Sequence, residues 1–151
     1  MIDISTHITW KEATHSETAE SLGINNEPGK SALKAMQYVA NNVFEPARNH
    51  FGKPIRVSSF FRCRELNKAI GGSKSSQHVH GEAIDMVAIG FTNKELFDFI
   101  RQRGIFDQLI AEFPDENEEP KWVHVSLKMQ NNRRQAMYSS KVNGKTVYYN
   151  V

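Results

Sequence analysis

The chain has 151 residues, of which 39% are hydrophobic and 24% are charged, and its formal net charge at pH 7 is +2. This length suits one domain with a single core, and the near-balance of charge excludes a strong electrostatic preference for nucleic acid or an anionic membrane. No apolar run approaches the roughly 18 residues that a membrane-spanning helix needs, so we expect no membrane insertion. We therefore predict a single domain over residues 1–151.

The N-terminal segment bears on where the protein is located, and the single cysteine bears on which kinds of cross-link and metal site it can form. The opening MIDISTHITWKEATHSE lacks the basic and apolar regions of a secretory signal, so we expect a soluble protein that is cytoplasmic as synthesised. Cys63 is the only cysteine, which excludes an internal disulfide and a site built from several thiolates. Any metal ion must then be held by histidine and carboxylate side chains. Composition leaves the oligomeric state open.

The first half of the chain predicts mainly helices. Residues 31–50 carry apolar side chains near helical spacing after a break at residues 26–29, and so predict a helix with one face on the core. The other expected elements are a shorter helix over residues 14–22 that ends at Gly23, a strand over residues 54–61, and a helix over residues 64–70 that ends at Gly71 and Gly72.

The second half predicts mainly strands. In residues 81–88 the side chains alternate, so that Asp85 faces opposite to Ile84 and Met86. Helices followed by a mostly antiparallel sheet predict an α+β fold, with helices flanking the sheet. The remaining expected elements are a helix over residues 93–102 with a capping box of Thr92 and Glu95 and an end at Gly104, and strands over residues 106–113, 122–127, 135–139 and 146–151, the last two joined by a turn at Asn143-Gly144.

Two segments carry the residue types of a metal site. His78 ends the polar loop after Gly72, and Asp85 lies seven residues later in a predicted strand, with Gly81 between them to let the backbone bend. Imidazole and carboxylate ligands suit zinc, and a catalytic zinc ion keeps three protein ligands and one open position. The third ligand must come from elsewhere, and His124 in the predicted strand over residues 122–127 is the natural supplier. His80 is a rival ligand, because a His-x-His pair can also chelate.

Several separated motifs occur in one order along the chain. They are Ser76-x-His78-x-x-Gly81-x-Ala83-x-Asp85, then Trp122-x-His124, together with residues 51–62, 66–72 and 106–112. Over roughly residues 8–127 the chain resembles the zinc D-Ala-D-Ala carboxypeptidase family. That family includes vancomycin-resistance dipeptidases and phage endolysins, and it shares its fold with the hedgehog signalling domain.

The resemblance implies both an activity and a set of residues. At matching positions, His78, Asp85 and His124 would bind Zn²⁺, Arg62 would contact the substrate or the polarised carbonyl, and Ser76 would line the substrate site. The implied reaction is hydrolysis of an amide bond in the stem peptide of peptidoglycan, by a D-Ala-D-Ala carboxypeptidase or a murein endopeptidase. The cell wall is then the expected place of action, reached by release at lysis or delivery in a virion if the protein is phage-encoded.

The general base departs from the family pattern. Many relatives carry a carboxylate three residues before the last histidine ligand, where it can take a proton from the attacking water. Here that position is Lys121, which is unsuited to the role beside a dication. Glu112, at the end of the predicted strand over residues 106–113, is our candidate for the base. Glu118 and Glu119 in the acidic run are the fallback.

Other readings of these residues remain open at this stage. His7, His15 and His50 are expected to be surface or packing histidines, and Trp122 is expected to lie in the core. Lys121 also allows a zinc-containing module that binds the cell wall without cutting it. In a further alternative the chain binds no metal and its histidines are structural.

Overall fold

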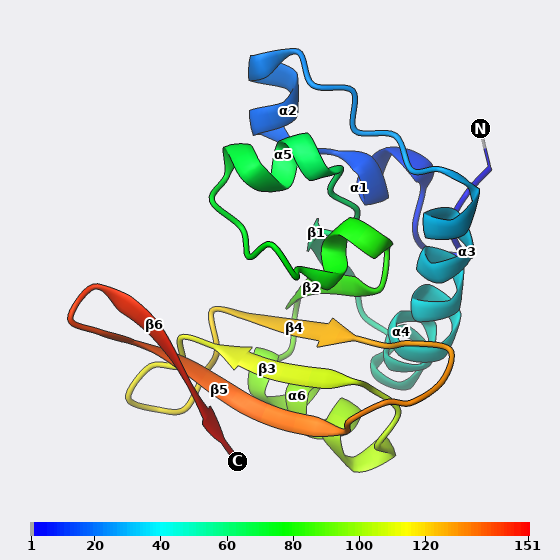
Figure 1. Cartoon of the computed structure of the whole chain (residues 1–151). Helices are drawn as coiled ribbons and strands as arrows, with labels where there is room; N and C mark the ends of the chain where they lie inside the picture. Colours follow the sequence, from blue (N-terminus) through cyan, green and yellow to red (C-terminus); the bar gives the residue numbers. More distant parts are fainter. Residues whose placement is uncertain (1) are drawn as a thin grey trace.

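The computed structural model describes residues 2–151, and Met1 lies outside the described residues (Figure 1). Its helices begin and end where the sequence supplies capping groups. The helical elements are α1 (Trp10–Thr14), α2 (Glu17–Leu22), α3 (Lys30–Val39), the π-helix η1 (Ala40–Phe44), α4 (Glu45–Phe51), α5 (Arg64–Ala69), the 3₁₀-helix η2 (Gln77–His80) and α6 (Asn93–Arg103).

Local capping accounts for most of these boundaries. Thr92 and Glu95 form the predicted capping box at the start of α6, and Gly23 and Gly104 end α2 and α6 in the left-handed conformation. The predicted helix over residues 14–22 corresponds to α2, which begins only at Glu17 because Ser16 is extended and caps it, while Thr14 is the last residue of α1. The helix predicted over residues 31–50 is continuous from α3 to α4, although η1 widens it in the middle.

Within residues 2–151 the strands form one six-stranded sheet of order β1-β2-β4-β3-β5-β6. The α+β class is confirmed, and four of the five strand pairs are antiparallel. The β3–β5 pair is parallel, so the sheet is mixed. The strands are β1 (Ile55–Ser59), β2 (Ala83–Ala88), β3 (Gln108–Glu112), β4 (Trp122–Ser126), β5 (Gln135–Val142) and β6 (Lys145–Asn150).

The parallel pair follows from the positions already occupied beside β4. A short loop over residues 127–134 sends the chain from β4 back in the opposite direction. Both neighbours of β4 are taken by β2 and β3, so β5 adds at the free edge of β3. Because β3 and β4 are antiparallel, a strand that runs opposite to β4 is parallel to β3. The predicted turn at Asn143-Gly144 then joins β5 to β6, with positive φ at both residues.

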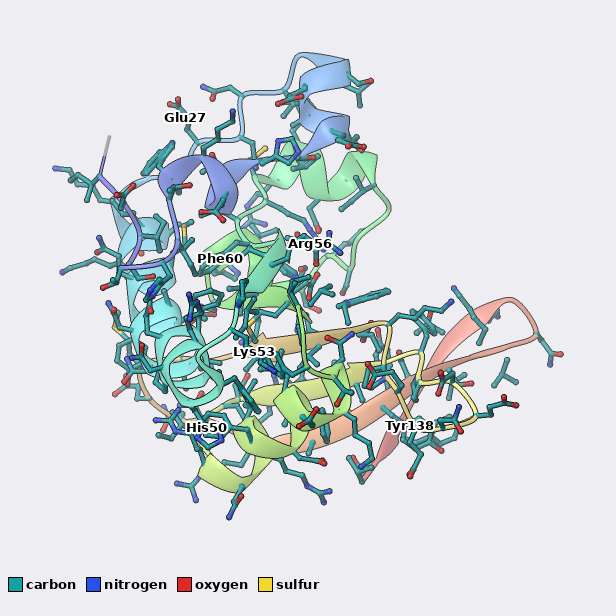
Figure 2. All side chains as sticks on the ribbon, turned by 180° about the vertical axis from the view of Figure 1, so that it is seen from behind. Glu27, His50, Lys53, Arg56, Phe60 and Tyr138 are labelled. Atoms are coloured by element: carbon teal, nitrogen blue, oxygen red, sulfur yellow. The ribbon has the colours of Figure 1, made fainter. Side chains whose placement is uncertain are left out.

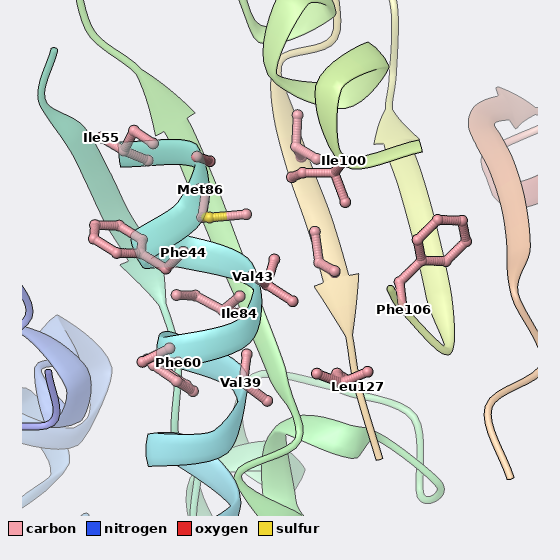
Figure 3. Packing of buried hydrophobic residues seen from close by; sticks show 14 of the residues in the cluster. Val39, Val43, Phe44, Ile55, Phe60, Ile84, Met86, Ile100, Phe106 and Leu127 are labelled. Carbon is pink, nitrogen blue, oxygen red and sulfur yellow. The ribbon is translucent and has the colours of Figure 1, made fainter. Parts of the chain in front are cut away.

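One face of the sheet packs on helices and forms the core. Val39, Val43 and Phe44 from α3 and η1 lie over Ile84 and Met86 of β2 (Figure 3), and all are at most 1% exposed. Figure 1 shows α1, α2 and α5 gathered beyond the β1 edge, while the β5–β6 hairpin projects from the other side. No helix among residues 2–151 is long and apolar enough to cross a membrane. The opposite face of the sheet is not covered by these helices.

Candidate metal centre and active-site cleft

The strand register gathers the predicted site residues on the sheet face that the helices leave open. Asp85 of β2 pairs with His124 of β4, and His124 pairs in turn with Ile110 of β3. Directly cross-strand residues point to the same face of a sheet. Because side chains alternate along each strand, Ile84 and Met86 enter the core while Asp85 faces the open side.

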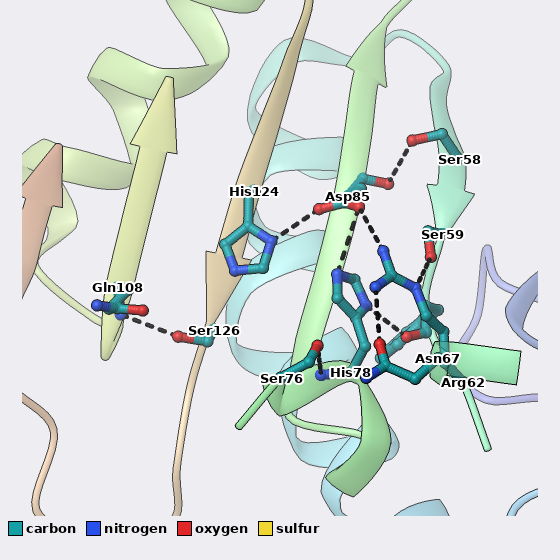
Figure 4. Close-up of polar contacts among 11 residues, drawn as sticks. Ser58, Ser59, Arg62, Asn67, Ser76, His78, Asp85, Gln108, His124 and Ser126 are labelled. Atoms are coloured by element: carbon teal, nitrogen blue, oxygen red, sulfur yellow. Dashed lines mark hydrogen bonds and ion pairs between the residues drawn. The ribbon is translucent and has the colours of Figure 1, made fainter. Parts of the chain in front are cut away.

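His78, Asp85 and His124 form a group that can bind a metal ion, since one ligand atom from each lies within 4.8 Å of the others. The two Asp85 oxygens divide between the histidines (Figure 4): Oδ2 lies 3.3 Å from Nε2 of His78, and Oδ1 lies 2.8 Å from Nδ1 of His124. Ligand atoms around a tetrahedral zinc ion are separated by about 3.3 Å, given bonds of about 2.0 Å. The three side chains therefore fit such an ion with small adjustments.

His78 supplies the observation that points most directly to a ligand. Its Nδ1 lies 2.7 Å from the backbone oxygen of Phe60, and because a carbonyl only accepts hydrogen bonds, Nδ1 carries the proton. In the neutral imidazole Nε2 then carries the lone pair, and it points toward the other two side chains. This buried nitrogen has no hydrogen-bond partner among residues 2–151. A carbonyl that fixes the tautomer of a ligating histidine is the usual arrangement at metal sites.

A turn at Gly81 brings His78 beside Asp85. Gly81 has φ +72° and ends η2, where its N–H donates to the backbone oxygen of His78 at 3.2 Å. An added Cβ at this position would overlap the backbone oxygen of Ala32 in α3. The conformation and the close approach both require glycine. The bend that the sequence predicted lies at Gly81, where the approach of α3 leaves no room for a side chain.

Arg62 lies at the β1 side of the group. Its Nη2 is 3.7 Å from Oδ2 of Asp85, Nε donates to Ser59 Oγ at 3.2 Å, and Nη1 donates to Asn67 Oδ1 at 3.3 Å. Burial lowers the pKa of Arg62, while the Asp85 carboxylate opposes that shift. Three partners thus fix the guanidinium beside the candidate ligands (Figure 4). Asn67 was not singled out from the sequence, because an asparagine on a short helix carries no local sign of this contact.

Replacing Gly72 by Ala is expected to disturb Arg62 through Asn67. An added Cβ would overlap the amide oxygen of Asn67, whose nitrogen donates to the backbone oxygen of Ser73 at 2.8 Å. Gly72 does not have a positive φ, so the overlap and not backbone strain is the cause. We expect Gly72→Ala to lower the free energy of unfolding by about 1–3 kcal/mol and to reduce hydrolysis.

Thermal unfolding and cell-wall hydrolysis measure this effect. The Asn67→Ala background provides the control, because it has no amide oxygen to displace. There the Gly72→Ala substitution is expected to change little. An equal loss in both backgrounds would contradict the contact with Asn67.

Glu112 lies on the other side of the candidate metal group. It is 8% exposed and lines a cleft of about 620 Å³ together with Arg62, Asp85 and His124. Burial raises the pKa of Glu112 to about 7; the Asp85 charge adds to the rise, while His124 and a hydrogen bond with Ser139 oppose it. A carboxyl group with a pKa near neutrality can accept and return a proton at physiological pH.

The other carboxylates considered for the base are engaged elsewhere. Both carboxylate oxygens of Glu119 accept hydrogen bonds at the start of α6, from the N–H groups of Asn93 at 3.0 Å and Lys94 at 2.9 Å. Glu118 does not line the cleft. Asp85 and Glu112 are the carboxylates among the described residues that line it. Lys121 is also outside that lining, and its ammonium lies 6.0 Å from the centre of the Phe113 ring.

Of the remaining residues considered in the sequence, Ser76 and Trp122 line the cleft and His80 does not. Ser76 lines it, and its Oγ accepts a hydrogen bond from the backbone N–H of His78 at 3.3 Å. His80 is exposed and lines a separate hollow with Glu82. Trp122 also lines the cleft and is only partly buried, so the expectation of a core position is wrong. Its place in β4 puts it on the same open face as His124.

The three other histidines lie away from this group. Nδ1 of His7 is 2.7 Å from a Glu45 oxygen, and His15 lies 3.4 Å from Glu20. His50, labelled in the view from behind (Figure 2), stacks on Phe99 with ring centres 4.3 Å apart. These positions match the packing and surface roles expected from the sequence.

Comparison with known proteins gives one family. No match to this chain was found among curated protein sequences. The family model described as Peptidase M15 matches residues 6–126, a range that contains all three candidate ligands together with Arg62, Ser76 and Glu112. This match confirms the resemblance seen in the sequence motifs. The chain therefore belongs to the peptidase M15 family.

Proposed function

We propose that the protein is a zinc metallopeptidase that hydrolyses amide bonds in the stem peptides of peptidoglycan. The observation that carries this proposal is the convergence of the unpaired Nε2 of His78 with Asp85 and His124, in a cleft that also presents Glu112. Two imidazoles and one carboxylate are a donor set that suits zinc and leaves a position for water or substrate.

Each side chain has a distinct task in this reaction. Zinc, when bound, supplies a Lewis acid that polarises the scissile carbonyl and activates a water molecule. Glu112 accepts a proton from the attacking water and passes it to the leaving amine, which its pKa of about 7 allows. Arg62 stabilises the negative charge that develops on the carbonyl oxygen. Ser76 lines the cleft beside His78 and contacts the substrate.

The choice of peptidoglycan rests on the motifs shared with the D-Ala-D-Ala carboxypeptidases and endolysins. A family resemblance supports the chemistry of a site more firmly than its substrate, so the substrate is the part to test. The proposed place of action is the bacterial cell wall.

Digestion of purified peptidoglycan followed by mass spectrometry of the released fragments tests the function. We expect fragments that differ from the undigested material by hydrolysis of one amide bond, and the masses identify that bond. Intact peptidoglycan after incubation with the zinc-loaded protein would contradict the proposal. Metal analysis of protein purified without chelator provides a second test, because a content far below one zinc ion per chain would exclude a resident metal.

The alternative hypothesis is a module that binds the cell wall without hydrolysing it. It arose because Lys121 occupies the position where many relatives carry the general base. Lys121 is outside the lining of the cleft, while Glu112 is in it. The two hypotheses differ in the outcome of Lys121→Asp. A hydrolase that uses Glu112 keeps its rate, whereas an inert wild-type protein that gains activity would support the binding module.

A further inference from the structure

The row of side chains that contains Glu112 continues onto the β5–β6 hairpin. Parallel pairing sets Ala111 beside Tyr138, so the next residues, Glu112 and Ser139, are neighbours. Ser139 is fully buried, its Oγ accepts a hydrogen bond from the backbone N–H of Phe113 at 3.1 Å, and it pairs with Tyr148 of β6. The side chain between Glu112 and Tyr148 is therefore a small one.

Tyr148 belongs to the wall of the cleft. It is 52% exposed and lines the cleft together with Gln135 and Met137 of β5. Burial, followed by the charges of Glu112 and Asp85, raises the pKa of Tyr148, which keeps the phenol protonated and able to donate. All three wall residues follow residue 126, where the match to the family model ends.

We propose that the β5–β6 hairpin binds the leaving-group side of the substrate, and that Tyr148 donates a hydrogen bond to the peptide there. This inference rests on the proposed hydrolysis. Glu112 returns the proton to the leaving amine, so that nitrogen lies near Glu112 in the reaction. Arg62 lies on the opposite side of the candidate ligands and faces the carbonyl oxygen. The part of the substrate peptide that carries the leaving amine then extends over β3, β5 and β6.

The charge of this wall identifies the kind of leaving group. Gln135, Met137 and Tyr148 are uncharged at neutral pH. The cation beside them is Arg133, which is half-exposed but whose charge is paired with that of the buried Asp107 carboxylate through two hydrogen bonds, at 3.1 and 2.7 Å. A carboxypeptidase binds the carboxylate of a single departing residue, and such a carboxylate calls for an available cation. The wall is suited instead to a leaving amine whose peptide chain continues, which is the substrate of an endopeptidase.

Neighbouring tyrosines provide a matched pair of variants. Tyr149 points to the other face of β6, where its ring stacks on Tyr138 with centres 5.0 Å apart. We expect Tyr148→Phe to lower kcat/KM for cross-linked muropeptides about tenfold, the effect of one lost hydrogen bond. Tyr149→Phe should stay within about twofold of wild type. Thermal unfolding should be the same for both variants.

Two substrates separate the endopeptidase from the carboxypeptidase. We expect the wild-type protein to cleave cross-linked muropeptides and to leave the free pentapeptide stem ending in D-Ala-D-Ala largely intact. Removal of only the terminal D-Ala from the free stem would overturn the assigned leaving group. Equal activity of Tyr148→Phe and Tyr149→Phe would overturn the contact with Tyr148.

A binding measurement keeps this inference separate from the proposed hydrolysis. The affinity of zinc-loaded Glu112→Gln for cross-linked muropeptides, measured by calorimetry, should fall about tenfold when Tyr148→Phe is added. An unchanged affinity contradicts the contact whether or not the wild-type protein cleaves anything. A wild-type protein that cleaves neither substrate contradicts the proposed function, and a fall in affinity would then still support the contact.

Discussion

Replacing Glu112 by Gln is expected to abolish most hydrolysis while making the metal-free protein more stable at pH 8. The amide keeps the size of the side chain but cannot accept the proton of the attacking water, and the loss of a general base lowers kcat by roughly 10²- to 10⁴-fold. The gain in stability has a separate cause, which is the cost of burying the ionised carboxylate.

The sign of the pH dependence follows from the direction of the shift. The pKa of Glu112 is raised from 4.5 to about 7 in the folded protein, so the folded state holds this proton more tightly than the unfolded state does. The unfavourable contribution is absent below about pH 4.5, grows as the pH rises, and is complete above about pH 7. The shift corresponds to roughly 3 kcal/mol. Protonation of Glu112 removes the base, so hydrolysis by the wild-type protein should fall at low pH.

Denaturant unfolding of metal-free wild type and Glu112→Gln at pH 5 and pH 8 measures the effect. We expect a small difference at pH 5 and a gain in free energy of unfolding of up to roughly 3 kcal/mol at pH 8. Glu116→Gln, a substitution at an exposed position in the acidic loop, is the control and should change neither stability nor hydrolysis. Full activity of the Glu112→Gln variant would exclude Glu112 as the base.

Replacing His78 by Ala is expected to remove both the metal and the activity. The substitution deletes the nitrogen whose lone pair is directed at Asp85 and His124, and leaves two candidate ligands. We expect zinc affinity to fall by at least about a hundredfold, since even changes behind a metal ligand cost 10- to 100-fold. Zinc content by mass spectrometry and hydrolysis of purified cell wall are the two measurements. The rise in thermal stability on adding zinc should also disappear.

His80 provides the control for this experiment, because it lies two residues away in the same short helix. Its ring is exposed and lines a different hollow. We expect His80→Ala to keep its zinc and its activity. The reverse result, with zinc lost from His80→Ala and retained by His78→Ala, would assign the ligand to His80 and overturn the site.

The base illustrates what a sequence pattern leaves open. The spacing before His124 directed attention to Lys121, a position that the family pattern fills with a carboxylate. In the structure Lys121 precedes β4 and does not line the cleft, while Glu112 faces it from the neighbouring strand. Which carboxylate faces the candidate ligands depends on the register of β3 against β4, and that register is set by packing between residues distant in the chain.

Several features of this protein were determined by the sequence itself, because their causes are local. The capping box at Thr92, the turn at Asn143-Gly144 and the bend at Gly81 depend on the conformations and hydrogen bonds of a few adjacent residues. The types of the candidate ligands, two histidines and an aspartate, were also readable, because a lone cysteine leaves imidazole and carboxylate as the donors.

Only the tertiary structure decided which elements lie on the two sides of the cleft, beside Glu112 and beside Arg62. The β5–β6 hairpin reaches Glu112 because β5 adds in parallel to the free edge of β3, and no local pattern encodes which edge is free. The support of Arg62 by Asn67 likewise depends on a helix folding back beside the end of β1. Local chemistry thus determined the types of the candidate ligands and the positions of the turns. Strand order and register determined which residues surround the candidate ligands, because they depend on burying the whole core at once.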